Sequence, residues 1–131
     1  MKSVLRTAAG LVVGYALMVI LITLVQETWL GGVAYGKSSA GVLVLAGGLT
    51  CVAAMIGSLA ATLIARPTGR AAAVAMSCVV VLETTVLILR GRVNGPLWFD
   101  LMAAGSLIVS VLLAAEILVR KTRVRPTMPT A

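Results

Sequence analysis

The chain contains no histidine, few aromatic residues and few charged ones. Of its 131 residues, 4% are aromatic and 11% are charged, whereas 60% are hydrophobic. A soluble domain carries about 25% charged residues and could not bury so much apolar surface. The mean hydropathy is +1.10. The composition therefore excludes an ordinary water-soluble fold and favours helices that face lipid.

The absence of histidine also argues against several kinds of cofactor site. Cys51 and Cys78 each lie inside a long apolar run, and the sequence contains no CxxC pair. Structural zinc, haem with two histidine ligands and thioredoxin-type redox chemistry are therefore disfavoured. A free cysteine usually packs as a small hydrophobic residue. We expect neither a metal nor a cofactor.

The net charge of +7 does not indicate nucleic-acid binding. Such a site needs clustered Lys and Arg side chains together with stacking aromatic residues. Here the basic residues lie between the apolar runs. We expect the lipid bilayer, and no nucleic acid, as a partner of this chain.

Four apolar stretches are long enough to cross a bilayer. A helix needs about 20 mainly apolar residues to span a hydrocarbon core of about 30 Å. The stretches that qualify are residues 7–26, 40–65, 71–89 and 96–119. Helix breakers form the turn 66–70, and a basic tail, expected to be disordered, covers 121–131. The sequence predicts one all-α domain, an integral membrane four-helix bundle with up-down-up-down topology.

The placement of basic residues predicts the orientation of the bundle. Lys and Arg in short loops favour the cytoplasmic side. One side of the predicted bundle carries eight of them: Lys2, Arg6, Arg66, Arg70, Arg120, Lys121, Arg123 and Arg125. The other side carries three: Lys37, Arg90 and Arg92. We expect both termini in the cytoplasm, a bacterial inner-membrane location, and Trp29 and Trp98 as anchors at the outer interface.

Small residues mark the faces through which the helices should pack. Helices in lipid approach closely where Gly, Ala and Ser recur at i, i+4 spacing. The first span has Gly10 and Gly14 in a GxxxG pattern, which favours packing within the chain over dimerisation. The second span carries two adjacent stripes, which contain Ala54, Gly57, Ser58 and Ala61. We expect the second helix to lie at the centre of the bundle.

Glu83 is the ionisable residue deepest inside a predicted span. Such residues usually face the protein interior or a wet cavity. At similar depth the other spans offer the hydroxyls of Thr50 and Ser106, which are the hydrogen-bond partners we expect for it, while Tyr15 is interpreted as a packed aromatic. Two interpretations follow: a proton- or cation-coupled site, or a structural carboxyl that is held by hydroxyls or extends partly toward Arg90. Nearer the basic side, Glu116 and Arg120 have the i, i+4 spacing of a surface ion pair.

Two segments carry a resemblance to a known group of proteins. The second span ends in the small-residue segment 57–65, and the fourth opens with a proline–tryptophan pattern at 96–101. In these features the chain resembles uncharacterised small four-span membrane proteins of bacteria, which implies a fold and no activity. Small multidrug transporters carry an acid in their first span, which this chain lacks. The glycine-rich first span and Thr-Phe-Ser segment of fluoride channels are also missing.

The sequence alone leaves two functions open. The small-residue stripes, without any nucleophile–base pair or metal-ligand cluster, favour a non-enzymatic accessory or assembly subunit that acts through helix packing on a membrane-protein partner. The alternative is a small transporter or channel, a homo-oligomer that uses Glu83.

Overall fold

The chain folds into four long helices. The structure, a computed structural model, describes residues 1–32, 38–91 and 97–123, and within the last range the side chains of 101–121. Its elements are α1 (Lys2–Thr23), the π-helical η1 (Leu24–Trp29), α2 (Ala40–Ile64), α3 (Gly69–Leu89) and α4 (Leu97–Arg123). All four long helices are long and apolar enough to cross a membrane, by length and composition. The prediction of an all-α chain with four apolar helices is confirmed.

The first and last helices extend beyond the predicted spans. The first begins at Lys2 and continues through η1 to Trp29, and α4 continues to Arg123, so residues 121–123 are helical rather than disordered. The reason is that a helix needs satisfied backbone hydrogen bonds, not apolar side chains, and basic side chains at its ends can reach the headgroup layer. The rest of the predicted tail, and the loops with Lys37, Arg92 and Asn94, lie outside the described residues.

The helices α1 and α2 approach each other closely at three glycines. A Cβ atom on Gly14 would lie 2.6 Å from the carbonyl oxygen of Gly57, and a Cβ on Gly57 would lie 2.6 Å from the carbonyl oxygen of Gly14. A Cβ atom on Gly10 would likewise lie 2.6 Å from the carbonyl oxygen of Ala61. No side chain larger than hydrogen fits these positions unless a backbone moves. The GxxxG pattern of α1 is therefore occupied inside the chain, by the glycine–alanine stripe of α2.

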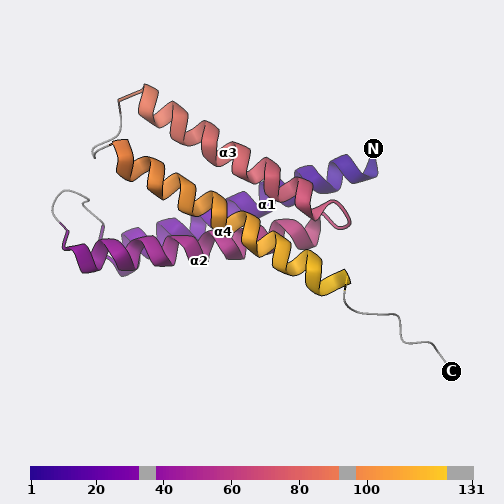
Figure 1. The fold of residues 1–131 in the computed structure, drawn as a ribbon, viewed down its shortest axis with the longest axis horizontal. Coiled ribbons are helices and arrows are strands. Elements are labelled where there is room, and N and C mark those ends of the chain that lie inside the picture. Colours follow the sequence, from indigo (N-terminus) through magenta and orange to yellow (C-terminus); the bar gives the residue numbers. More distant parts are fainter. Residues whose placement is uncertain (33–37, 92–96, 124–131) are drawn as a thin grey trace.

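The short turn between α2 and α3 brings three helix ends together. A Cβ atom on Gly69 would lie 2.9 Å from the carbonyl oxygen of Thr62, so α3 starts directly against the end of α2. The hydroxyl groups of Thr7 and Thr68 share a hydrogen bond of 2.7 Å, which joins α1 to the same turn. Figure 1 shows the N-terminus, this turn and the C-terminal end of α4 at one end of the molecule. We call this end, which contains residues 65–69, the turn end.

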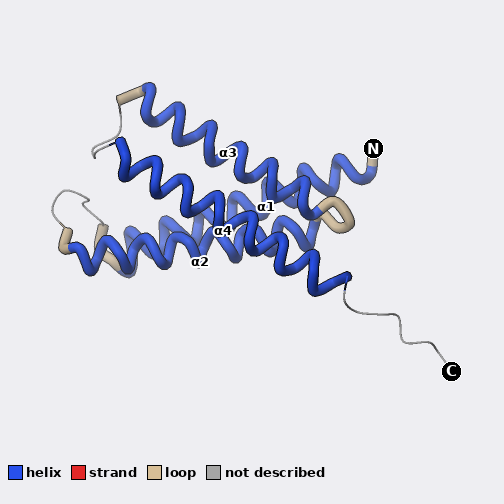
Figure 2. Tube along the Cα trace, in the orientation of Figure 1, coloured by secondary structure: helices blue, strands red, loops and turns tan. Residues whose placement is uncertain are grey.

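The buried core lies in the half of the molecule next to the turn end. All buried residues of α3 fall between Gly69 and Val80. Those of α4, within its described side chains, fall between Ser110 and Ala115. Figures 1 and 2 show the α3–α4 pair diverging from the α1–α2 pair toward the opposite end. The last part of α3 and its C-cap, from Val81 to Arg90, is here called the open half, and the other described residues cover it little.

Candidate functional site

A hydrogen bond between Tyr15 and Glu83 joins α1 to the open half of α3. The phenol of Tyr15 donates to carboxylate oxygen Oε2 of Glu83. Glu83 lies 14 residues after Gly69, or about 21 Å along α3, and six residues before Leu89. Both partners belong to helices that can cross a membrane. The carboxyl–phenol pair thus lies away from the ends of both apolar helices.

The partners expected for Glu83 were wrong. Thr50 donates instead to the carbonyl oxygen of Ala46, one turn earlier in α2, and accepts from the amide of Gln26. Ser106 donates to the carbonyl oxygen of Ala103 in its own helix. Ser and Thr in apolar helices commonly bond to a carbonyl of the preceding turn, so equal depth does not imply contact. The structure shows that α1, rather than α2 or α4, supplies the hydrogen-bond partner of Glu83.

The expectation that Glu83 faces the interior also needs correction. Its side chain is exposed on the chain described here, while Tyr15 is half-buried. On α3 the neighbouring Leu82 is 66% exposed, and the hydroxyls of Thr84 and Thr85, the next two residues, donate to carbonyl oxygens of the preceding turn. The sequence interpretation of Tyr15 was a packed aromatic, and no sequence pattern pairs it with Glu83, which lies 68 residues away. The sequence contained no signal for the divergence that exposes the pair.

The expected packing residues of α2 lie at the centre of the described core. Ala54, Ser58 and Ala61 are fully buried, and Gly57 lies at the crossing with α1. The hydroxyl of Ser58 donates to the carbonyl oxygen of Val111 at 2.6 Å, which links α2 to α4. Of the two expected anchors, Trp29 ends η1 and is 78% exposed. The side chain of Trp98 is outside the described residues.

An ionic cluster lies on α3 and α4 near the turn end. Glu116 accepts from Arg120 at 2.9 Å, which confirms the predicted i, i+4 pair. It also accepts from Nη2 of Arg70, at 2.9 Å to Oε1 and 2.8 Å to Oε2. The contact with Arg70 could not be read from the sequence, because 46 residues separate the partners. The cluster ties the start of α3 to the last turns of α4.

The described residues contain no cluster of metal ligands, and the chain matches no known protein in the comparisons made. Among the described ranges, no group of three or more His, Cys, Asp and Glu residues could hold a metal ion. Comparison of the chain with protein families, curated proteins and solved structures finds no match. Fold and site together define a multi-helix chain suited to a membrane, with an exposed carboxyl–phenol pair at membrane depth.

Proposed function

We propose that this chain is a non-enzymatic accessory or assembly subunit of the bacterial cytoplasmic membrane. In this proposal its open half binds a transmembrane helix of a partner protein. The observation that carries the proposal is the exposure of Glu83 at membrane depth, with Tyr15 as its hydrogen-bond partner. Ionisable groups in spans normally face protein or water, because contact with lipid is unfavourable for them. A partner helix at this position would remove the carboxyl group from lipid.

The surface around Glu83 suits a helix that carries a hydrogen-bond donor. Exposed apolar side chains surround the carboxyl group on α3, among them Leu82, Val86 and Leu87. The small residues of α1 and α2 already contact one another, so they support packing within the chain rather than with a partner. An interhelical hydrogen bond in lipid contributes about 1 kcal/mol, and the apolar contacts beside it set orientation and fit.

The orientation proposed is up-down-up-down, with both termini in the cytoplasm. Support comes from the eight-to-three distribution of basic residues between the two sides. The basic residues Lys2, Arg66 and Arg70 belong to the end that holds the N-terminus and the α2–α3 turn (Figure 1).

Photo-crosslinking in native membranes tests the partner proposal. A crosslinker at Val86, which is one turn after Glu83 and 39% exposed, should form an adduct with another membrane protein. The control position is Val52, which is 51% exposed and lies at similar depth on α2. The adduct at Val86 should persist in Glu83→Gln, whose amide keeps a hydrogen bond, and decrease several-fold in Glu83→Leu. Equal adducts at both positions, or no effect of Glu83→Leu, would contradict the proposal.

A small oligomeric transporter or channel is the second candidate function. The Tyr15–Glu83 pair favours it, because a carboxyl group beside a phenol in a span can bind and release a proton or cation. An adduct of twice the chain mass of 13.4 kDa would identify a second copy at Val86. Glu83→Gln should then fold normally and abolish a proton- or cation-dependent flux in reconstituted vesicles. Normal flux in that variant would exclude this function for Glu83.

A further inference from the structure

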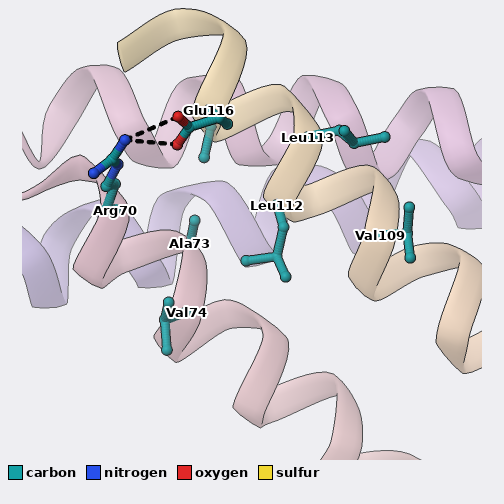
Figure 3. A pocket seen from close by; sticks show the side chains of 8 residues that line it. Arg70, Ala73, Val74, Val109, Leu112, Leu113 and Glu116 are labelled. Atoms are coloured by element: carbon teal, nitrogen blue, oxygen red, sulfur yellow. Dashed lines mark hydrogen bonds and ion pairs between the residues drawn. The ribbon is translucent and has the colours of Figure 1, made fainter. Parts of the chain in front are cut away.

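Two cavities meet at Arg70. The first is a groove of about 510 Å³ between α3 and α4, and Figure 3 shows its walls. Its lining is apolar apart from the ion pair of Arg70 and Glu116 at one end. The lining residues are Arg70, Ala73, Val74, Val109, Leu112, Leu113, Ala115 and Glu116. Glu116 and Val109 are seven residues apart, so the groove extends about 10 Å along α4 from the ion pair toward the middle of the span. Its dimensions and chemistry suit a hydrocarbon chain.

The second cavity lies at the turn end and is basic. It measures about 540 Å³ and is lined by Thr62, Arg66, Pro67, Thr68, Gly69, Arg70, Ala71, Leu118 and Val119. Two arginines and no carboxylate belong to this described lining. The first residues of α3 also belong to it, and the positive end of the helix dipole favours an anion there. The lining includes Thr62, whose hydroxyl is the buried side-chain polar atom without a hydrogen-bond partner in the described chain.

We infer that these cavities bind one anionic glycerophospholipid. Its phosphate lies between Arg66 and Arg70, and one acyl chain follows the groove between α3 and α4. An anionic head next to an apolar chain matches a basic cavity and an apolar groove that have Arg70 in common. The inference depends on the chain spanning a membrane, and not on a protein partner at Glu83. It holds for whichever leaflet contains the turn end.

The charges around the site favour an anionic headgroup over a zwitterionic one. The charged groups that line the two cavities are the guanidinium groups of Arg66 and Arg70 and the carboxylate of Glu116, and a third arginine, Arg120, contacts Glu116. The single carboxylate is already bonded to two of the three arginines. Arg70 uses one nitrogen, Nη2, for Glu116, and its other N–H groups remain as donors for a phosphate. Glu116 nevertheless competes with the lipid for Arg70, because its carboxylate is a second anion beside the same guanidinium group.

Lipid binding to the full chain in detergent tests the inference. Native mass spectrometry would compare phosphatidylglycerol with phosphatidylcholine of the same acyl chains. The wild-type chain should bind one phosphatidylglycerol at least about fivefold more tightly, an effect expected for each basic residue near an anionic headgroup. Equal affinity for the two lipids would overturn the inference. So would equal binding of glycerol 3-phosphate, because the site would then be an anion site without a chain-binding part.

Matched variants locate the headgroup. Arg66→Gln and Arg70→Gln should each weaken phosphatidylglycerol binding about fivefold. Lys2→Gln removes the same charge at the same end but lies outside both cavity linings, and should change binding less than about twofold. Equal losses in all three variants would show a diffuse charge effect and contradict the site.

Two further variants distinguish a lipid site from a merely structural ion pair. Glu116→Gln should strengthen phosphatidylglycerol binding, because it removes the competitor for Arg70, whereas a structural pair predicts no gain. Val74→Trp fills the groove and should weaken binding of both lipids. The control Val81→Trp is on the same helix, is 49% exposed, and lines neither cavity. Weaker binding in Glu116→Gln, or equal effects at Val74 and Val81, would overturn the inference, and circular dichroism identifies any variant that fails to fold.

Discussion

Ser58 and Ser106 show how differently two serines can act in apolar helices. The hydroxyl of Ser58 is fully buried and bonds across to α4, at the carbonyl oxygen of Val111. The hydroxyl of Ser106 bonds inside its own helix, to the carbonyl oxygen of Ala103, and the residue is exposed. Only the first of these bonds requires the tertiary fold. The same residue type therefore contributes to the association of two helices in one case and to local helix bonding in the other.

Replacement of each serine by alanine should separate these roles. Ser58→Ala should lower the free energy of unfolding by about 1 kcal/mol, the typical value of an interhelical hydrogen bond in lipid. Ser106→Ala should change it by less than about 0.5 kcal/mol, because it loses a bond within a helix. Reversible unfolding in bicelles measures both variants. An equal loss in the two would show that the Ser58–Val111 bond does not contribute to stability.

At the scale of elements, the crossing of α1 and α2 depends on three glycines. Gly10, Gly14 and Gly57 leave no room for a Cβ atom. Gly47, on the same α2 helix, has no atom within 4 Å of its Cβ position. The glycine count of a helix therefore does not show which glycines allow a close approach. The contact exists only where the small residues of two helices meet at one point.

Single Gly→Ala substitutions in these two environments should have opposite effects. In Gly14→Ala the new Cβ would lie 2.6 Å from the carbonyl oxygen of Gly57, so α1 and α2 must separate and stability should fall by about 1–3 kcal/mol. In Gly47→Ala the Cβ meets open space, and the higher helix propensity of alanine should raise stability by up to about 1 kcal/mol. Unfolding in bicelles measures both effects. A destabilising Gly47→Ala or a neutral Gly14→Ala would contradict the observed crossing.

At the scale of the whole molecule, the helices form two pairs that meet at the turn end and diverge at the other (Figure 1). The core near the turn end is built mainly of small residues, with Met76, Val80 and Val111 as larger members. The opposite half exposes apolar side chains on α3 and α4, such as Leu87 at 43% and Leu101 at 54%. In a membrane this half is available to lipid or to another helix. The molecule thus combines a half with a buried core and a half whose helix pairs diverge, and apolar side chains are exposed in the first half too, such as Val74 at 53% and Ile117 at 57%.

Cysteine labelling should reveal which end of the molecule faces the cytoplasm. In a Cys51→Ala, Cys78→Ala background, single cysteines at Gly36 and Asn94 should react with an impermeant maleimide in intact spheroplasts, because the basic side of a membrane protein stays in the cytoplasm. Cysteines at Lys2 and Arg66 should react only after permeabilisation. Arg66 is preferred to Gly69, where any side chain would meet Thr62. Labelling of Lys2 in intact spheroplasts would reverse the proposed orientation.

Composition and run length alone determined the four apolar helices. A span needs about 20 apolar residues whatever its neighbours, so each helix could be predicted from its own segment. The spacing of Glu116 and Arg120 likewise predicted their ion pair, because both lie on one helix. For the same reason, the GxxxG pattern predicted that Gly10 and Gly14 form a contact face, though not which residues they meet.

The relative positions of the helices were decided only by the tertiary structure. Equal depth suggested Thr50 and Ser106 as partners of Glu83, but depth leaves the rotation and crossing angle of each helix undefined. These depend on which small residues allow two backbones to touch, as at Gly14 and Gly57. The resulting arrangement of the helices places Tyr15 next to Glu83, and the short turn before α3 places Arg70 next to Glu116. Such contacts form between distant segments, so no local pattern in the sequence encodes them.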